Sequence, residues 1–140
     1  MIRPPKPGSP SYTLWKKEAD AIDDALASRI RVMSRRLGAL PGITCIESPS
    51  TFFVLASLDL PEKAAEEAKK RGKKPDEFYA VELLHETGIC VIPGAAFGEK
   101  PGRSSYRASC SCPWVEEDLV AMEKFHLSFM EKYGRAAGKL

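Results

Sequence analysis

An arginine inside a short apolar run is the residue of this sequence best suited to binding chemistry. Arg107 lies in SYRASC, residues 105 to 110, and charged side chains are seldom buried without a partner. Alternation along a strand places Arg107 with Ser105 and Ser109 on the more polar of the two faces. Because its N–H donors form a rigid fork, a guanidinium on a strand suits bidentate recognition of a planar carboxylate. The residues alone leave a second interpretation open, an arginine in an intramolecular salt bridge or at a sheet edge.

Other familiar catalytic patterns are missing from the sequence. It contains no GxSxG, HExxH or Walker sequence, and PGAAFG, residues 93 to 98, has too few glycines for a dinucleotide fingerprint. The two histidines, His85 and His126, lie far apart in the sequence on faces of expected helices. We interpret both as partly buried or surface histidines rather than as site residues.

The sequence has four cysteines, which is few for its length: Cys45, Cys90, Cys110 and Cys112. Three of them occur in strand-like apolar stretches, where small buried thiols are common. We expect them to be reduced. Cys110 and Cys112 would share one side of an extended segment, but nothing supplies the further ligands that a metal site needs. The sequence therefore predicts no metal site.

The composition is typical of an ordinary soluble protein of one domain. The chain has 140 residues, of which 44% are hydrophobic and 29% charged, and no apolar run approaches the roughly 20 residues of a membrane span. The net charge is +2, from 21 basic and 19 acidic residues, which gives little support to a nucleic-acid partner. The basic run KKRGKK, residues 69 to 74, suggests a nucleic-acid patch, but a solvated face is favoured because no aromatic residues interleave with its charges.

Periodicity predicts four helices and four short strands. Helices are expected from Trp15 to Leu37, within 61 to 74, from Pro75 to Gly88 and from Pro113 onward, and strands at 43 to 47, 51 to 58, 89 to 92 and 105 to 110. The first helix has an apolar stripe along its whole length, and the last helix has one too, whereas the second has almost no large apolar residue and is expected to be a solvated surface helix. The strands at 43 to 47 and 51 to 58 are expected to form a hairpin, and Gly88 is expected to end its helix in the left-handed region. This order predicts an α+β fold, with two long helices on one face of a small mixed or antiparallel sheet.

Four segments become distinctive when they are taken together. They are MIRPPKPGSPSY at the start, PDEFYAVELLHETGICVIPGAAFG at 75 to 98, YRASC at 106 to 110 and EKFHLSFMEKY at 123 to 133. In register and over nearly the whole chain, they resemble the C-terminal part of the alanine aminotransferase family, pyridoxal-phosphate enzymes of class I/II and fold type I. The chain departs from that family at SPSTFFVLAS, where the family reads like QGAMYAFP, and at YRASC, where it reads like FRMT.

The resemblance implies a division of the chain and a site within it. Residues 1 to 12 would be an extended lead from a large domain missing from this sequence, 13 to 134 the small C-terminal aminotransferase domain, and 135 to 140 a frayed tail. Arg107 would bind the substrate α-carboxylate, while Pro93 and Gly94 would shape the active-site loop. The Schiff-base lysine would lie upstream, so we expect no catalytic residue, no bound cofactor and no activity in this fragment alone.

The resemblance also implies what the parent enzyme does. It would transfer an amino group between L-alanine and 2-oxoglutarate with pyridoxal phosphate as cofactor, and it would be a homodimer. The partners of the fragment would be the amino acid, the 2-oxo acid and its own large domain, with no nucleic acid and no membrane. A cytoplasmic location is the default, and a mitochondrial one is the alternative. A stand-alone, non-catalytic binding module with the same fold is the second hypothesis.

Overall fold

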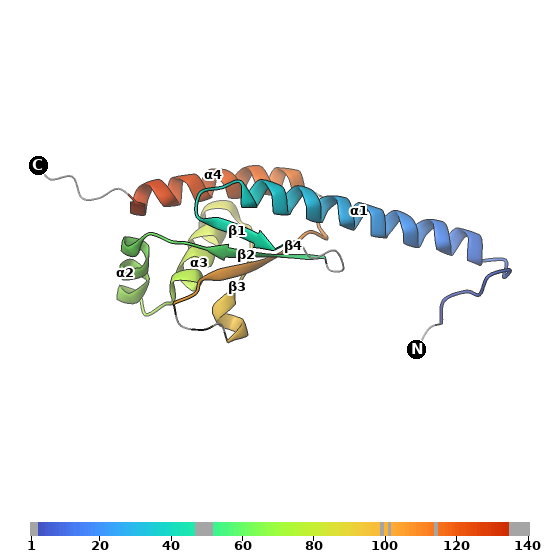
Figure 1. Cartoon of the computed structure of the whole chain (residues 1–140), viewed down its shortest axis with the longest axis horizontal. Coiled ribbons are helices and arrows are strands. Elements are labelled where there is room, and N and C mark those ends of the chain that lie inside the picture. The colour runs from blue at the N-terminus through green and yellow to red at the C-terminus, as the bar shows by residue number, and fades with distance from the viewer. Residues whose placement is uncertain (1–2, 47–51, 99, 101, 114, 135–140) are drawn as a thin grey trace, which may run out of the picture.

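The chain folds into helices packed on one small sheet (Figure 1), and the computed structural model describes residues 3–46, 52–98, 100, 102–113 and 115–134. The helices are α1 (Tyr12–Gly38), α2 (Glu62–Lys70), α3 (Pro75–Thr87) and α4 (Val115–Gly134). The strands are β1 (Ile43–Ile46), β2 (Phe53–Leu58), β3 (Ile92–Pro93) and β4 (Ser105–Ser109), and a 3-10 helix, η1 (Gly94–Phe97), follows β3. The predicted order of helices and strands is confirmed, and η1 is the element that the sequence did not predict.

The four strands form one antiparallel sheet in the order β1-β2-β4-β3. β1 and β2 are paired neighbours, which confirms the predicted hairpin, although its turn at 47 to 51 lies outside the described residues. β4 pairs with β2 on one side and β3 on the other, so it is an interior strand. The predicted strand at 89 to 92 is wrong in its bounds: β3 is an edge strand of two residues, the second of which, Pro93, has no N–H to donate.

Helices α1, α3 and α4 cover one face of this sheet (Figure 1). We call it the covered face; its strand residues are buried and include Val54, Ala56, Tyr106 and Ala108. The apolar stripe predicted for α4 is confirmed, because Leu119, Met122, Phe125 and Phe129 are all buried. As predicted, Gly88 ends α3 in the left-handed region, with φ at 77°, where a side chain would be strained.

The first helix has partners for only half of its predicted stripe. Ile30, Met33 and Leu37 are buried, whereas Trp15 and Ile22 are exposed where α1 extends beyond the sheet (Figure 1). A helix of 27 residues is about 40 Å long, and the longest strand, of six residues, spans only about 20 Å. α1 is therefore too long for its whole apolar stripe to pack against this sheet.

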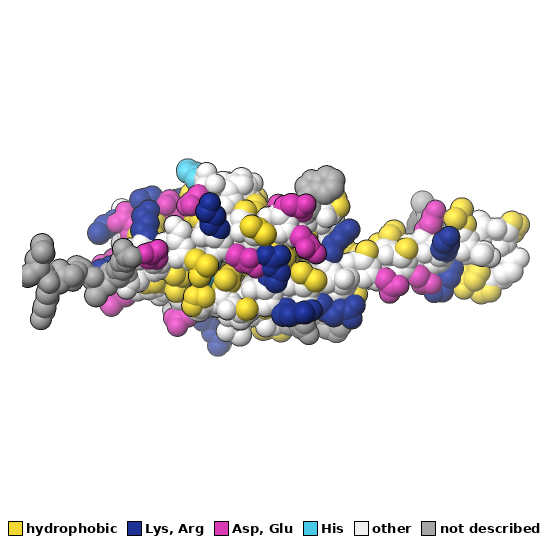
Figure 2. All heavy atoms as spheres, turned by 90° about the horizontal axis from the view of Figure 1, so that it is seen from above, with side chains coloured by type: hydrophobic (Ala, Val, Ile, Leu, Met, Phe, Trp, Pro, Cys, Tyr) yellow, Lys and Arg dark blue, Asp and Glu magenta, His cyan; other side chains and the backbone are white. Residues whose placement is uncertain are grey.

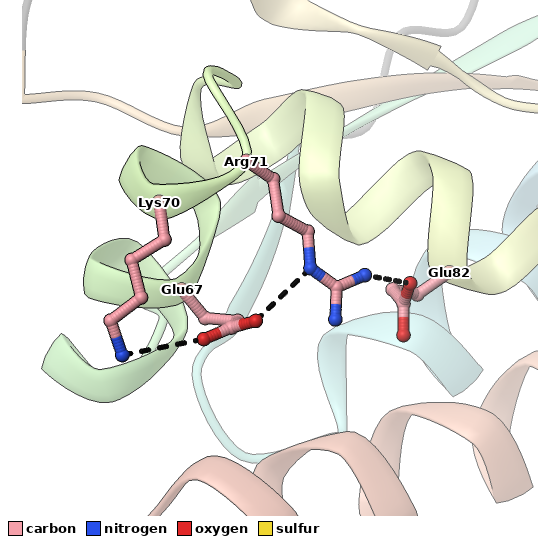
Figure 3. Close-up of polar contacts among 4 residues, drawn as sticks. All are labelled: Glu67, Lys70, Arg71 and Glu82. Carbon is pink, nitrogen blue, oxygen red and sulfur yellow. Dashed lines mark hydrogen bonds and ion pairs between the residues drawn. The ribbon is translucent and has the colours of Figure 1, made fainter.

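Helix α2 is more than the solvated surface helix that the sequence predicted. Its Ala64 and Ala68 are fully buried, so small side chains allow α2 to approach the other helices closely. Figure 3 shows how its charged side continues onto α3: Glu67 accepts hydrogen bonds from Lys70 and Arg71, and Arg71 also contacts Glu82 of α3. The sequence does not reveal this interface, because the residues that α2 buries are alanines rather than large apolar residues.

An ion pair links the two long helices. Arg36 of α1 donates from Nε and one terminal nitrogen to the two oxygens of Glu123 of α4, at 2.6 and 2.7 Å. This hydrogen-bonded carboxylate raises the pKa of Arg36. On the side of the molecule seen in Figure 2, acidic and basic side chains are interspersed, as the near balance of charges predicts. No helix of the described residues is long and apolar enough to cross a membrane.

Candidate functional site

Arg107 lies at the centre of the sheet face that no α-helix of the described residues covers, which we call the open face. In the antiparallel register it stands opposite Leu55 of β2 and Ile92 of β3. Directly opposed residues of an antiparallel pair project to the same side, so the three side chains share this face. Leu55 is 41% exposed and Ile92 39% exposed. The arginine is thus held on an interior strand with apolar neighbours on both sides.

Two aromatic rings contact the guanidinium. Its central carbon lies 4.3 Å from the ring centre of Phe53 and 4.6 Å from that of Phe97. Both distances are within the range of about 6 Å for cation–π attraction. Phe53 comes from β2 and Phe97 from η1, so elements on both sides of β4 orient the side chain.

The polar bonding capacity of Arg107 is not used up within the described part of the chain. Its Nε is buried and has no hydrogen-bond partner there, and none of the ion pairs between described residues includes it. The interpretation as an intramolecular salt bridge is therefore not supported, and the sheet-edge interpretation is wrong because β4 is interior. The expected polar surroundings are wrong too, since Phe53 and Phe97 come from other elements that alternation along β4 cannot reveal.

An open pocket of about 320 Å³ adjoins the guanidinium. Its lining residues are Leu55, Gly94, Phe97, Ser105 and Arg107. Gly94 begins η1 and lines the pocket with the arginine, whereas Pro93 ends β3 opposite Tyr106 and does not line it. The pocket has one cation in apolar surroundings, which fits a small carboxylate. Its described lining includes no lysine and no carboxylate, so these residues do not fit pyridoxal phosphate.

The two histidines differ sharply in their surroundings. His85 is exposed on α3, whereas His126 of α4 is buried and bonded at both ring nitrogens. The carbonyl of Pro41 can only accept, so His126 donates from Nε2 across 2.8 Å, and its Nδ1 accepts from the Tyr79 hydroxyl across 2.9 Å. Burial lowers the pKa of His126. The neutral ring is a structural link between α3, α4 and the turn before β1.

The four cysteines lie in different surroundings. All four are free thiols. Burial raises the pKa of Cys45 to about 11 and also raises that of Cys110, whose thiol donates to the Phe52 carbonyl. Cys90, expected in a buried strand, is instead exposed just before β3. No cluster of three or more His, Cys, Asp or Glu side chains suited to a metal ion occurs within the described ranges.

Sequence reasoning missed three residues that shape this site. From the sequence, Phe53 is predicted only to lie in a strand, Phe97 in a loop and Asp76 at the start of a helix. In the structure Asp76 is buried and accepts a hydrogen bond from the Ala95 amide of η1. The sequence does indicate that Asp76 lies at a helix N-terminus, because an acidic residue directly after a proline is typical of that position. It does not reveal the hydrogen bond from the Ala95 amide.

Solved structures with similar backbones define the class of the fold. An alanine aminotransferase from Pyrococcus furiosus aligns with 84% of this chain and 26% of its own, at a TM-score of 0.64 and 21% identity. A PLP-dependent aminotransferase from Streptococcus suis aligns with 90% of this chain and 29% of its own, at a TM-score of 0.63 and 14% identity. The chain therefore has the α+β fold of the small C-terminal part of a fold type I aminotransferase.

The sequence comparisons identify the family. Residues 11–123 match the profile of the family described as Aminotransferase class I and II, and the chain belongs to that family. It is 42% identical to a putative alanine aminotransferase of Schizosaccharomyces pombe over 133 residues, and 39% identical to a probable mitochondrial alanine aminotransferase of Dictyostelium discoideum over 135 residues. Each alignment covers 95% of this chain but only 27% and 25% of the relative. The chain thus spans about a quarter of the length of these relatives.

Proposed function

We propose that this chain is the C-terminal part of an alanine aminotransferase, and that Arg107 binds the substrate carboxylate. The observation that carries the proposal is the unbonded Nε of Arg107: the side chain adjoins an open pocket, and this buried nitrogen has no hydrogen-bond partner among the described residues. The similarity to alanine aminotransferases of several organisms supports the reaction, transfer of an amino group between L-alanine and 2-oxoglutarate.

The role of Arg107 in this reaction is to bind and orient. A guanidinium fixed on an interior strand presents paired donors to a carboxylate, which holds the reacting carbon of the amino acid in one orientation. The rings of Phe53 and Phe97 keep water from part of the guanidinium, which strengthens its attraction for an anion. Gly94 lines the pocket at the start of η1, and Pro93 is the residue before it. In this proposal none of these residues exchanges a proton with the substrate.

Pyridoxal phosphate supplies the electron sink for amino-group transfer in enzymes that use it. Because the described residues that line the pocket include no lysine or carboxylate, we assign cofactor binding to the remaining three quarters of a protein of the relatives' length. The missing share of the relatives' length makes a large domain one expected partner, and membership of the aminotransferase family makes a second copy of the protein another. Several relatives are named as mitochondrial enzymes, so we propose a mitochondrial or cytoplasmic location.

The test is an assay of pyruvate formation from L-alanine and 2-oxoglutarate in a protein of the relatives' length that contains this chain. Arg107→Ala should lower kcat/KM by about 100-fold or more, because it removes two charge-assisted hydrogen bonds. Arg103→Ala is the matched control, since Arg103 is exposed and does not line this pocket. Equal losses in the two variants would contradict the assignment of Arg107.

A second candidate is a stand-alone binding module without catalysis. It is favoured by the pocket itself, whose described lining has one cation, Arg107, but no lysine or carboxylate for proton transfer or cofactor attachment. The assay of the longer protein separates the two, because only an aminotransferase transfers the amino group. The 140-residue chain by itself, supplied with pyridoxal phosphate, should be inactive in either case. We expect no turnover and no cofactor absorption band that depends on one lysine. A lysine-dependent band together with turnover would disprove both this module and our expectation that the chain is inactive alone.

A further inference from the structure

A buried carboxylate on α3 connects the helix to the wall of the Arg107 pocket. Asp76 is only 2% exposed, and both of its oxygens accept hydrogen bonds. Oδ1 accepts from the Glu77 amide at 3.0 Å, which is a contact within the first turn of α3. Oδ2 accepts from the Ala95 amide at 2.7 Å, which joins α3 to η1 across 19 residues of sequence. The second bond is the one that matters for the site.

Asp76 is not needed to begin the helix. Glu77 already accepts a hydrogen bond from the Lys74 amide at 2.8 Å, and Pro75 occupies the first helical position. A carboxylate is costly to bury unless it is hydrogen-bonded, and here the second oxygen is used for a contact outside the helix. The position of Asp76 thus serves the placement of η1 rather than the start of α3.

The segment that Asp76 holds forms one side of the pocket. Ala95 lies between Gly94, which lines the pocket, and Phe97, which both lines it and contacts the guanidinium of Arg107. Phe97 is nevertheless 53% exposed, so burial alone does not fix it. η1 is a single short turn of four residues, and the bond from Asp76 is a specific anchor on it.

We propose that Asp76 is a positioning residue of the Arg107 carboxylate site, acting through the Ala95 amide and Phe97. The proposal rests on the proposed function of Arg107 and extends it to a residue that does not touch the pocket's cation. Asp76 holds η1, η1 presents Phe97, and Phe97 limits the orientations of the guanidinium. Loss of the Asp76 bond should therefore weaken carboxylate binding while Arg107 itself stays in place.

The experiment uses NMR on the 140-residue chain, with acetate as the probe. Three quantities are measured: the exchange rate of the Ala95 amide, the shift of the Arg107 Nε–H, which the nearby rings influence, and the affinity for acetate. Asp76→Asn keeps the size of the side chain but replaces one acceptor oxygen with a donor nitrogen. We expect faster Ala95 exchange by 10-fold or more, a moved Nε–H resonance and about 3- to 10-fold weaker acetate binding. Glu77→Gln is the control and should change none of the three.

A second variant tests Phe97, the residue through which Asp76 is proposed to act on Arg107. It also provides a test if Asp76→Asn does not fold. Phe97→Ala should weaken acetate binding by a similar factor and leave the Ala95 exchange rate unchanged. Combined in one chain, the two substitutions should weaken binding by less than the product of their separate factors, because they interrupt one connection. Unchanged acetate affinity in Phe97→Ala would overturn the proposal.

The outcomes also separate this proposal from the function on which it rests. If acetate leaves the Arg107 Nε–H of the unsubstituted chain unmoved, the carboxylate site itself is disproved. In that case the positioning role of Asp76 is still tested by comparing the Nε–H resonance of Arg107 between Asp76→Asn and the unsubstituted chain. A resonance that is the same in Asp76→Asn as in the unsubstituted chain, despite faster Ala95 exchange, would show that Asp76 holds η1 without influencing Arg107.

Discussion

His126, on the covered side of the sheet, and Arg107, on the open face, differ in how their nitrogens are bonded. On the covered face, His126 is bonded at both nitrogens, to Tyr79 and to Pro41. On the open face, Arg107 has an unbonded Nε and lies among exposed apolar side chains. Burying a polar group is costly unless it is paired, so the covered face is arranged for stability. The open face retains bonding capacity, which is what a binding site requires.

The sharpest test of this difference compares two apolar truncations. Phe129→Ala, on the helix side of the covered face, should lower the free energy of unfolding by about 3–5 kcal/mol because it leaves a cavity. Leu55→Ala, on the open face, should cost less than about 1 kcal/mol because its side chain is already 41% exposed. Urea unfolding followed by circular dichroism measures both. Similar losses would mean that the open face contributes to the core.

Two tyrosines on the covered face sharpen the comparison within it. Tyr79→Phe should cost about 1–3 kcal/mol of unfolding free energy, because it leaves Nδ1 of the buried His126 without its donor. The hydroxyl of Tyr106 is buried but has no partner in the described structure. Tyr106→Phe should therefore be neutral or slightly stabilising. Equal losses of unfolding free energy in the two variants would show that the hydrogen bond to His126 is not the source of the effect at Tyr79.

The ion pair between α1 and α4 should have a smaller effect. Arg36→Gln removes the cation but keeps much of the side chain, and it should cost about 0.5–1 kcal/mol, since the pair is partly exposed. The loss should shrink as salt is added, because salt screens the pair in the unsubstituted chain. Unfolding measured at low and high ionic strength tests this, with Arg31→Gln, an exposed arginine of the same helix, as the control.

The smallest effect at neutral pH is the titration of His126. Its folded-state pKa lies below the ordinary value of about 6.5, so the unfolded chain binds this proton more readily than the folded chain. The contribution of His126 to stability is full above about pH 6.5 and declines as the pH falls below it. Unfolding free energies between pH 7.5 and 5 should show this decline. His126→Gln should flatten it, and an equally steep decline in that variant would assign it to other groups.

Patterns along single segments predicted most of the elements but not their neighbours. The stripe of α4 and the end of α3 at Gly88 follow from local periodicity and from backbone freedom, and both are confirmed. The stripe of α1 is correct as a pattern, yet Trp15 and Ile22 are exposed, because the extent of the sheet decides how much of a helix is covered. The burial of Ala64 was missed, since close helix contact through small residues leaves little trace in a sequence.

The sequence by itself determined that Arg107 lies on a strand and that its side chain projects to the other face from those of Tyr106 and Ala108. It also determined that the chain resembles an aminotransferase. Only the tertiary structure decided what surrounds the guanidinium. Phe53, Phe97 and the anchor at Asp76 come from three other elements. Alternation reports the direction of a side chain within one strand, whereas strand order, register and the packing of η1 decide what that side chain meets.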